Sequence, residues 1–106
     1  MSEQVQASHI LVMHEESERS SATRTKEEAL TDCTAIKAEL DDGGDFAELA
    51  RGRSDCPSGR DGGDLGTFGR HAMVKAFEDA AFALEVGNTS DIIETDFGYH
   101  IIHRTG

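Results

Sequence analysis

The chain contains no long hydrophobic run and few basic residues. No stretch approaches the roughly 18 apolar residues that a membrane-spanning helix requires, so we expect no membrane partner. The 106 residues include 21 acidic and only 10 basic side chains, which gives a formal net charge of −11. Affinity for nucleic acid comes largely from clustered lysine and arginine, and because no such cluster occurs we expect no nucleic-acid partner. The length, with 37% apolar residues, predicts one soluble domain spanning residues 1–106.

Cysteine is also scarce, and the two cysteines make neither a disulfide framework nor a C-x-x-C pair. Cys33 falls at the core spacing of a predicted helix, which is typical of a small buried hydrophobe. Cys56 lies among Asp, Pro, Ser and Gly, where core packing does not explain it. The N-terminal residues 1–4 show no basic region followed by an apolar run, so we expect no signal peptide and a cytoplasmic location.

Two short apolar stretches at opposite ends of the chain each hold one histidine. They are Ser8-His9-Ile10-Leu11-Val12 and Phe97-Gly98-Tyr99-His100-Ile101-Ile102. Branched apolar residues bounded by polar residues or glycine are typical of buried strands. A buried imidazole is costly unless its ring nitrogens are hydrogen-bonded, so we expect His9 and His100 to pair across adjacent strands. On spacing alone, two separately satisfied core histidines remain the simpler interpretation.

The hydrophobic pattern predicts a strand, two helices, a long loop, a short strand, a third helix and a hairpin. Strands are expected over residues 5–14, 65–68, 91–95 and 99–104. Helices are expected from the capping box of Thr25 and Glu28 to Gly43 and Gly44, from Asp45 to Ala50, and from Met73 to Leu84 with Gly87 closing the last. Residues 52–64 are expected to form the loop. Apolar residues on both faces of 5–14 place that strand in the middle of a mainly antiparallel sheet.

The two histidines and Cys56 allow three chemical interpretations. A Cys/His hydrolase needs an oxyanion hole and usually an orienting third group, and the sequence shows neither. A zinc site needs closer ligand spacing than this chain offers. The third interpretation is a noncovalent site, in which two imidazoles and a thiol form a polar network beneath a bound amide. Gly62–Gly66 lacks the Lys-Ser/Thr of a phosphate loop, so we expect no bound nucleotide. We also expect no cofactor and no metal.

Four motifs in one consistent order resemble the parvulin family of peptidyl-prolyl cis/trans isomerases. They are Ser8–Val12, Asp64-Leu65-Gly66 with Phe68, Phe77–Leu84 and Phe97–Ile102, and they span nearly the whole chain. The resemblance implies an α+β domain of parvulin/FKBP-like fold, with a four-stranded antiparallel sheet surrounded by about four helices. It implies an isomerase that acts without a cofactor on proline-containing peptides and unfolded or flexible protein segments. A small domain of this type is expected to act as a monomer.

The resemblance also implies a role for individual residues. The catalytic group would be His9, His100, Thr95 and Cys56. The substrate-binding group would be Leu65, Met73 and Phe77 around the proline ring with Phe68 lining the pocket, together with Met13 and Phe97. Rotation about an X-Pro bond faces a barrier of about 18–20 kcal/mol but breaks no bond. A catalyst need only bind the twisted amide better than either planar form, so we interpret Cys56 as a polar group and not as a nucleophile.

Two further segments, 23–30 and Ser54-Asp55-Cys56, resemble the Pin-type, phosphate-directed branch of that family. The basic cluster of that branch is largely missing from this chain: Met13 stands where the branch has lysine, and of its paired arginines only Arg19 remains. That cluster lies on the loop after the first strand in the Pin-type branch, and here the corresponding segment carries Glu15, Glu16 and Glu18. Because bidentate arginine contacts are what normally secure a phosphate, we predict a general or hydrophobic-preferring isomerase with weak or no phosphate preference. The alternative is a proline-motif binding module or chaperone with incidental turnover.

Overall fold

The computed structural model describes residues 4–16, 24–55, 57–70, 73 and 75–106. In chain order the elements are β1 (Gln4–Val12), α1 (Lys26–Asp41), α2 (Phe46–Arg53), a short 3-10 helix η1 (Pro57–Asp61), β2 (Asp64–Gly69), α3 (Lys75–Ala83), β3 (Ile93–Thr95) and β4 (Gly98–Arg104). The predicted α+β class with a four-stranded antiparallel sheet is confirmed. In the described residues, three α-helices and η1 stand where about four helices were expected. No helix in this part of the chain is long and apolar enough to cross a membrane.

The sheet has the strand order β2-β1-β4-β3, and each neighbouring pair is antiparallel. β1 is therefore interior, as its two apolar faces predicted. In the β1–β4 ladder, His9 lies opposite Ile102 and Leu11 lies opposite His100. Residues opposite one another share a face, and so do alternate residues of one strand. The two histidines are consequently diagonal neighbours on the same face, within reach of each other's side chains.

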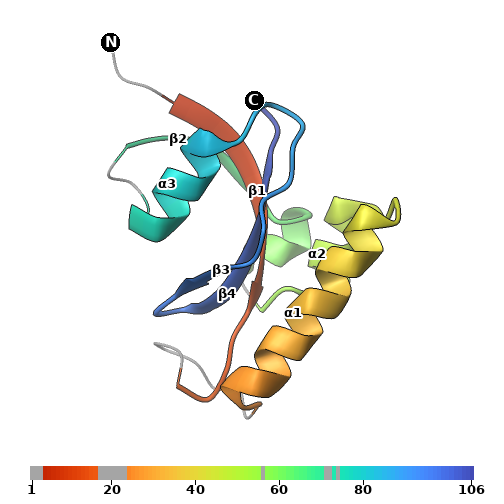
Figure 1. Cartoon of the computed structure of the whole chain (residues 1–106). Helices are drawn as coiled ribbons and strands as arrows, with labels where there is room; N and C mark the ends of the chain where they lie inside the picture. The colour runs from red at the N-terminus through yellow and green to blue at the C-terminus, as the bar shows by residue number, and fades with distance from the viewer. Residues whose placement is uncertain (1–3, 17–23, 56, 71–72, 74) are drawn as a thin grey trace.

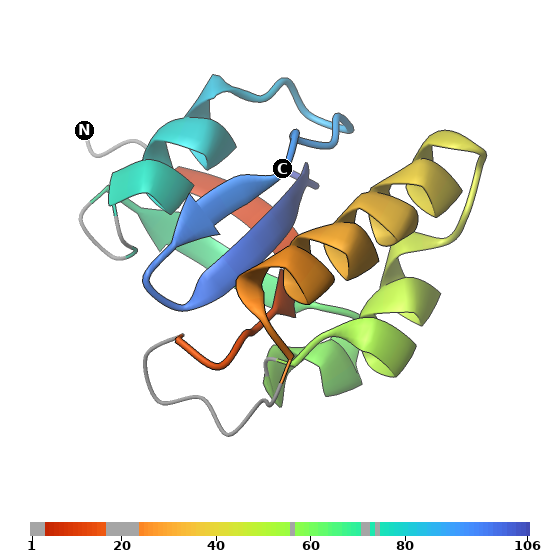
Figure 2. The ribbon, with the colours of Figure 1, turned by 60° about the horizontal axis from the view of Figure 1, so that its bottom comes forward.

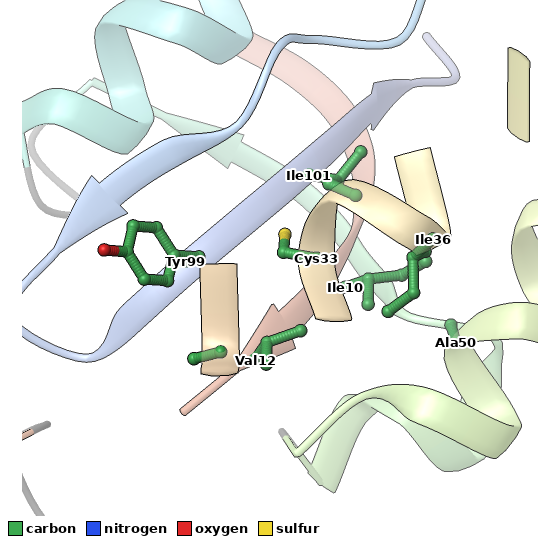
Figure 3. Packing of buried hydrophobic residues seen from close by; sticks show 8 residues of the cluster. Ile10, Val12, Cys33, Ile36, Ala50, Tyr99 and Ile101 are labelled. Carbon is green, nitrogen blue, oxygen red and sulfur yellow. The ribbon is translucent and has the colours of Figure 1, made fainter. Parts of the chain in front are cut away.

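Two buried clusters lie on opposite faces of the sheet, because successive residues of a strand point to opposite sides. Figures 1 and 2 show α1 and α2 on one side of the sheet and α3 on the other. The cluster beneath α1 and α2 consists of Ile10, Val12, Ala29, Cys33, Ile36, Ala50, Tyr99 and Ile101 (Figure 3). The cluster beneath α3 consists of Val5, Ala7, Phe68, Phe77, Ala81 and Ile102. Cys33 is fully buried in the first cluster, which confirms its predicted packing role.

The first two helices begin where the sequence predicted. The Thr25 hydroxyl accepts a hydrogen bond from the backbone N–H of Glu28 at 3.1 Å, and the Glu28 carboxylate accepts from the N–H of Thr25 at 2.9 Å. This reciprocal capping box satisfies two N–H groups that lack helical partners. Asp45 caps α2 in a simpler way, by accepting from the N–H of Ala47 at 3.1 Å. α1 ends at Asp41, just before Gly43 and Gly44.

Several predicted boundaries were wrong. α3 covers Lys75–Ala83, so Met73 and Leu84 lie outside it. After the helix, a tight turn forms in which the Leu84 N–H donates to the carbonyl of Ala81. This turn replaces the last helical turn that was predicted before Gly87. β1 ends at Val12 because the next N–H, that of Met13, binds a side chain instead of a neighbouring strand. The expected loop 52–64 begins within α2 and contains η1, and β3 begins at Ile93 and not at residue 91.

Candidate active site

His9 and His100 form a hydrogen-bonded pair on the α3 side of the sheet. Their Nδ1 atoms are 3.2 Å apart, and the rings are stacked with centroids 5.4 Å apart and planes inclined by 21°. Both side chains are buried. One Nδ1 must donate and the other accept, so at least one ring is neutral. The predicted pairing across adjacent strands is confirmed, and the pairing solves the burial problem that each histidine would otherwise face alone.

Thr95 extends this pair into a network. Its hydroxyl lies 2.7 Å from Nε2 of His100, and the backbone N–H of Phe97 donates to the same hydroxyl at 3.2 Å. Thr95 is the last residue of β3 and pairs with Gly98 across the hairpin, so the turn fixes its position. Both ring nitrogens of His100 are thereby satisfied. The chain of contacts runs from the hairpin turn through Thr95 and His100 to His9.

The network is uncharged at neutral pH. Burial lowers the pKa of His9 to about 4. Burial, and to a smaller extent the charge of His9, lowers the pKa of His100 to about 3. Burying a protonated imidazole away from water, with no anion beside it, raises its free energy, so the neutral form is favoured. At pH 7 the two rings therefore offer a polar but neutral surface, and neither is a cationic partner for an anionic substrate group.

Phe77 of α3 covers both imidazoles. Its ring meets His9 and His100 edge-to-face, with centroids 5.5 and 5.3 Å away and interplanar angles of 80° in each case. Phe68 of β2 lies next to it, with ring centroids 6.1 Å apart. Leu65 and Met73 pack against the same cluster and remain partly exposed. The structure thus brings all four predicted pocket residues to the face that carries the histidine pair.

A short segment before Cys56 completes the edge of β1. The N–H of His9 donates to the carbonyl of Gly63 at 2.9 Å, and beyond this point Ser54 and Asp55 replace β2 as the neighbour of β1. The Asp55 N–H donates to the carbonyl of Leu11 at 2.7 Å, and the Leu11 N–H donates to the Ser54 hydroxyl at 3.0 Å. Cys56 follows directly but lies outside the described residues, as do Glu18 and Arg19.

Met13 and Phe97 lie together at the end of the site where β1 meets the β3–β4 hairpin. A Cβ atom on Gly98 would come within 3.1 Å of the Met13 Cα, so the turn after Phe97 packs directly on Met13. Both side chains are partly exposed. Phe97 joins the histidine network through its N–H bond to Thr95. The predicted substrate-binding residues therefore fall into an apolar group beside α3 and a rim at this hairpin.

Comparison with known proteins agrees with this geometry. Residues 1–106 match the family described as the PPIC-type PPIase domain. The chain belongs to this family of peptidyl-prolyl isomerases. It is 46% identical over 116 residues to the peptidyl-prolyl cis-trans isomerase Pin1 of Digitalis lanata, covering 99% of this chain and 98% of that protein. The structure of the peptidyl-prolyl isomerase ESS1 from Candida albicans superposes with a TM-score of 0.91 at 39% identity, covering 97% of this chain and 63% of that one.

The chain is also similar to one domain-sized part of a bacterial protein. The isomerase is 50% identical over 102 residues to the foldase protein PrsA of a Geobacillus strain, covering 95% of this chain and 32% of that protein. The chain is thus a peptidyl-prolyl cis/trans isomerase, and its substrates are proline-containing peptides and protein segments. Rotation about the X-Pro bond needs no bond cleavage, which fits a site built from neutral imidazoles, a hydroxyl and apolar rings.

The sequence reasoning missed one pair of residues beside this site. Arg24 and Asp55 form an ion pair, and both also bind the backbone of Met13. They are 31 positions apart and belong to segments with no shared periodicity. No spacing rule connects such residues, so only the fold reveals the pair.

Proposed function

We propose that this isomerase acts on X-Pro bonds with a preference for apolar or uncharged residues before proline and with no selection for phosphate. The observation that carries this proposal is the state of Arg24, which lies beside Met13. Its guanidinium is 2.5 Å from the Asp55 carboxylate and 3.7 Å from that of Asp32. Bidentate arginine contacts are what normally secure a dianionic phosphate, and two carboxylates already contact this arginine.

The surroundings of Arg24 give further support. Glu15 and Glu16 are exposed at the start of the same loop, and no lysine stands at position 13. The alignment with the Digitalis isomerase runs over more residues than this chain contains, so that relative carries insertions that this chain lacks. The alignment with the PrsA foldase has 102 residues and covers 95% of this chain, so the foldase domain carries almost no insertion relative to this chain. In length this chain resembles the foldase domain more closely.

In this proposal each part of the site has its own role. The apolar group Leu65, Phe68, Met73 and Phe77 holds the proline ring. The neutral network of His9, His100 and Thr95 lies beneath the rotating amide, and Cys56 contributes a polar group beside its carbonyl. A poorly hydrated site lowers the barrier by favouring the twisted amide, which has lost its resonance and part of its charge separation, over the planar amide.

The similarity to a foldase also supports a second candidate, in which the domain mainly holds unfolded segments and turnover is incidental. The two candidates differ in how His9 variants behave. In the enzyme, His9→Gln lowers kcat/KM while a proline peptide still binds with a Kd within about twofold of the parent. In a binding module with incidental turnover, kcat/KM of the parent is already low, and His9→Gln leaves both kcat/KM and the peptide Kd unchanged.

The proposal is tested with tetrapeptides that differ only before proline, carrying Leu, Ala, Glu, Lys or phosphoserine. We expect the highest kcat/KM for Leu and Ala, and no gain for phosphoserine over Glu. A gain of 100-fold or more for phosphoserine would overturn the proposal. Such a result would mean that Arg19, in the loop before Arg24, suffices to bind phosphate.

A further inference from the structure

The ion pair of Arg24 and Asp55 joins three segments that are distant in the sequence. The Arg24 Nη1 donates to the Asp55 Oδ2 at 2.5 Å and to the carbonyl of Met13 at 2.9 Å. The same Asp55 oxygen accepts the Met13 N–H at 2.8 Å. The two charged groups therefore bind the N–H and the C=O of one residue, and they lie on the rim where Met13 meets the hairpin.

Backbone contacts keep this arrangement in place. The Glu15 N–H donates to the carbonyl of Arg24 at 2.8 Å, and the Asp55 N–H donates to the carbonyl of Leu11 at 2.7 Å. Arg24 and the segment before Cys56 are thus fixed to residues 11–15, at the end of β1 and just beyond it. The Arg24 and Asp55 side chains still expose 33% and 29% of their surface. A peptide bound over Met13 can therefore meet both charges.

We propose that the Arg24–Asp55 pair determines charge specificity for the residue before proline. This inference rests on the proposed function, and it takes Met13, one of the predicted substrate-binding residues, to lie beside that residue. While paired, the two charges nearly cancel, and the subsite favours neither anionic nor cationic side chains. Removing one partner leaves the other unbalanced next to the substrate, and specificity is a difference between affinities that a single charge can change.

The test compares Asp55→Asn and Arg24→Gln with the parent, using peptides with Glu or Lys before proline at low salt. We expect Asp55→Asn to raise the ratio of kcat/KM for Glu-Pro over Lys-Pro by about 3- to 10-fold, because the guanidinium loses its closer carboxylate and keeps only the more distant Asp32. Arg24→Gln should lower the same ratio by a similar factor, because the carboxylates remain without their cation. Both changes should shrink in 0.5 M salt, since exposed charges are screened.

A matched control is available on α1. Lys37 and Asp41 form an exposed ion pair of similar length, 2.8 Å, away from the site. Lys37→Gln and Asp41→Asn change the net charge of the molecule by the same amounts, and we expect them to leave the ratio unchanged. If they change it as much as the rim variants do, overall charge and not this pair sets the preference, and the proposal is wrong.

A purely structural role gives a different result. In that case Asp55→Asn and Arg24→Gln lower kcat/KM for both peptides by the same factor, and the proposal is overturned. Should either variant fold poorly, Arg24→Lys and Asp55→Glu keep the charges, and we expect them to retain the parental ratio even where the overall rate falls. The proposed function fails in another way, through a strong phosphoserine preference of the parent enzyme, so the two failures are distinguishable.

Discussion

The neutral state of His9 and His100 follows from where the two strands place them. Each ring is buried beneath Phe77, and no carboxylate among the residues that the structure describes makes a hydrogen bond or ion pair with either imidazole that would stabilise a cation. The hydrogen bond between the two imidazoles and the one between His100 and the Thr95 hydroxyl both suit neutral rings. A protonated ring would add a donor where the network needs an acceptor. The site therefore depends on the absence of charge as much as on hydrogen bonding.

This neutrality predicts a pH dependence of stability. The pKa of each ring is lower in the folded than in the unfolded chain, so the unfolded chain binds more protons as the pH falls below 6.5. Stability is therefore complete above the ordinary histidine pKa and decreases toward pH 4. Between pH 7 and pH 5 we expect a loss of about 2 kcal/mol from each ring, measured by urea unfolding.

Substitution of a histidine tests whether this loss of stability comes from the His9–His100 pair. His9→Gln should be less stable at pH 7 and should lose about half of the pH dependence. A free energy of unfolding that stays constant across this range in the parent would show that the rings are not held neutral by burial.

At the scale of elements, the edge of β1 decides the shape of the site. β2 pairs with β1 only as far as Ser8, and Gly63 then carries the chain past His9 in close contact. Gly63 has φ of +82°, and a Cβ atom there would lie 2.3 Å from the His9 carbonyl oxygen. Gly66 has a similar φ of +71°, but a Cβ atom there would meet nothing within 4 Å. A side chain at Gly66 would therefore meet only backbone strain, whereas a side chain at Gly63 would meet both backbone strain and a steric clash.

Alanine at the two positions should have unequal effects. Gly66→Ala should cost about 1 kcal/mol, because it introduces only the strain of a positive φ. Gly63→Ala should cost about 1–3 kcal/mol more, since the methyl group pushes the chain away from His9. Denaturant unfolding of both variants measures the difference. Equal losses would mean that the approach of Gly63 to β1 is not as close as described.

Local patterns in the sequence predicted the elements better than their ends. The capping box of Thr25 and Glu28 marked the start of α1, since that signal is complete within four residues. The end of β1 was not predictable, because the N–H of Met13 binds a carboxylate 42 residues away. The same limit applies to the site: motif order indicated the histidine pair, while the Arg24–Asp55 contact arises only when three segments meet.

At the scale of the whole molecule, one face of the sheet carries a closed hydrophobic core and the other carries the candidate active site. The α1 side is closed by a cluster that includes the fully buried Ile10, Ile36 and Ile101. The α3 side carries core residues at one end and the histidine pair with its apolar cover at the other. A central strand with apolar residues on both faces allows this division, because the stability supplied by one face leaves the other free to hold polar groups.

The most direct test is to map the binding of a tetrapeptide with Leu before proline by NMR chemical shifts. Binding on the α3 side should shift the signals of Leu65, Phe68 and Phe77 and the imidazole nitrogens of His9. Signals of Ile36 and Ile101 on the other side should not move. A separate cavity of about 680 Å³ is lined by His14, Glu16, Lys26, Glu94, Thr95 and Asp96. Shifts that gather around its Lys26 and Glu94, with His9, Phe68 and Phe77 unchanged, would contradict the assignment of the active site.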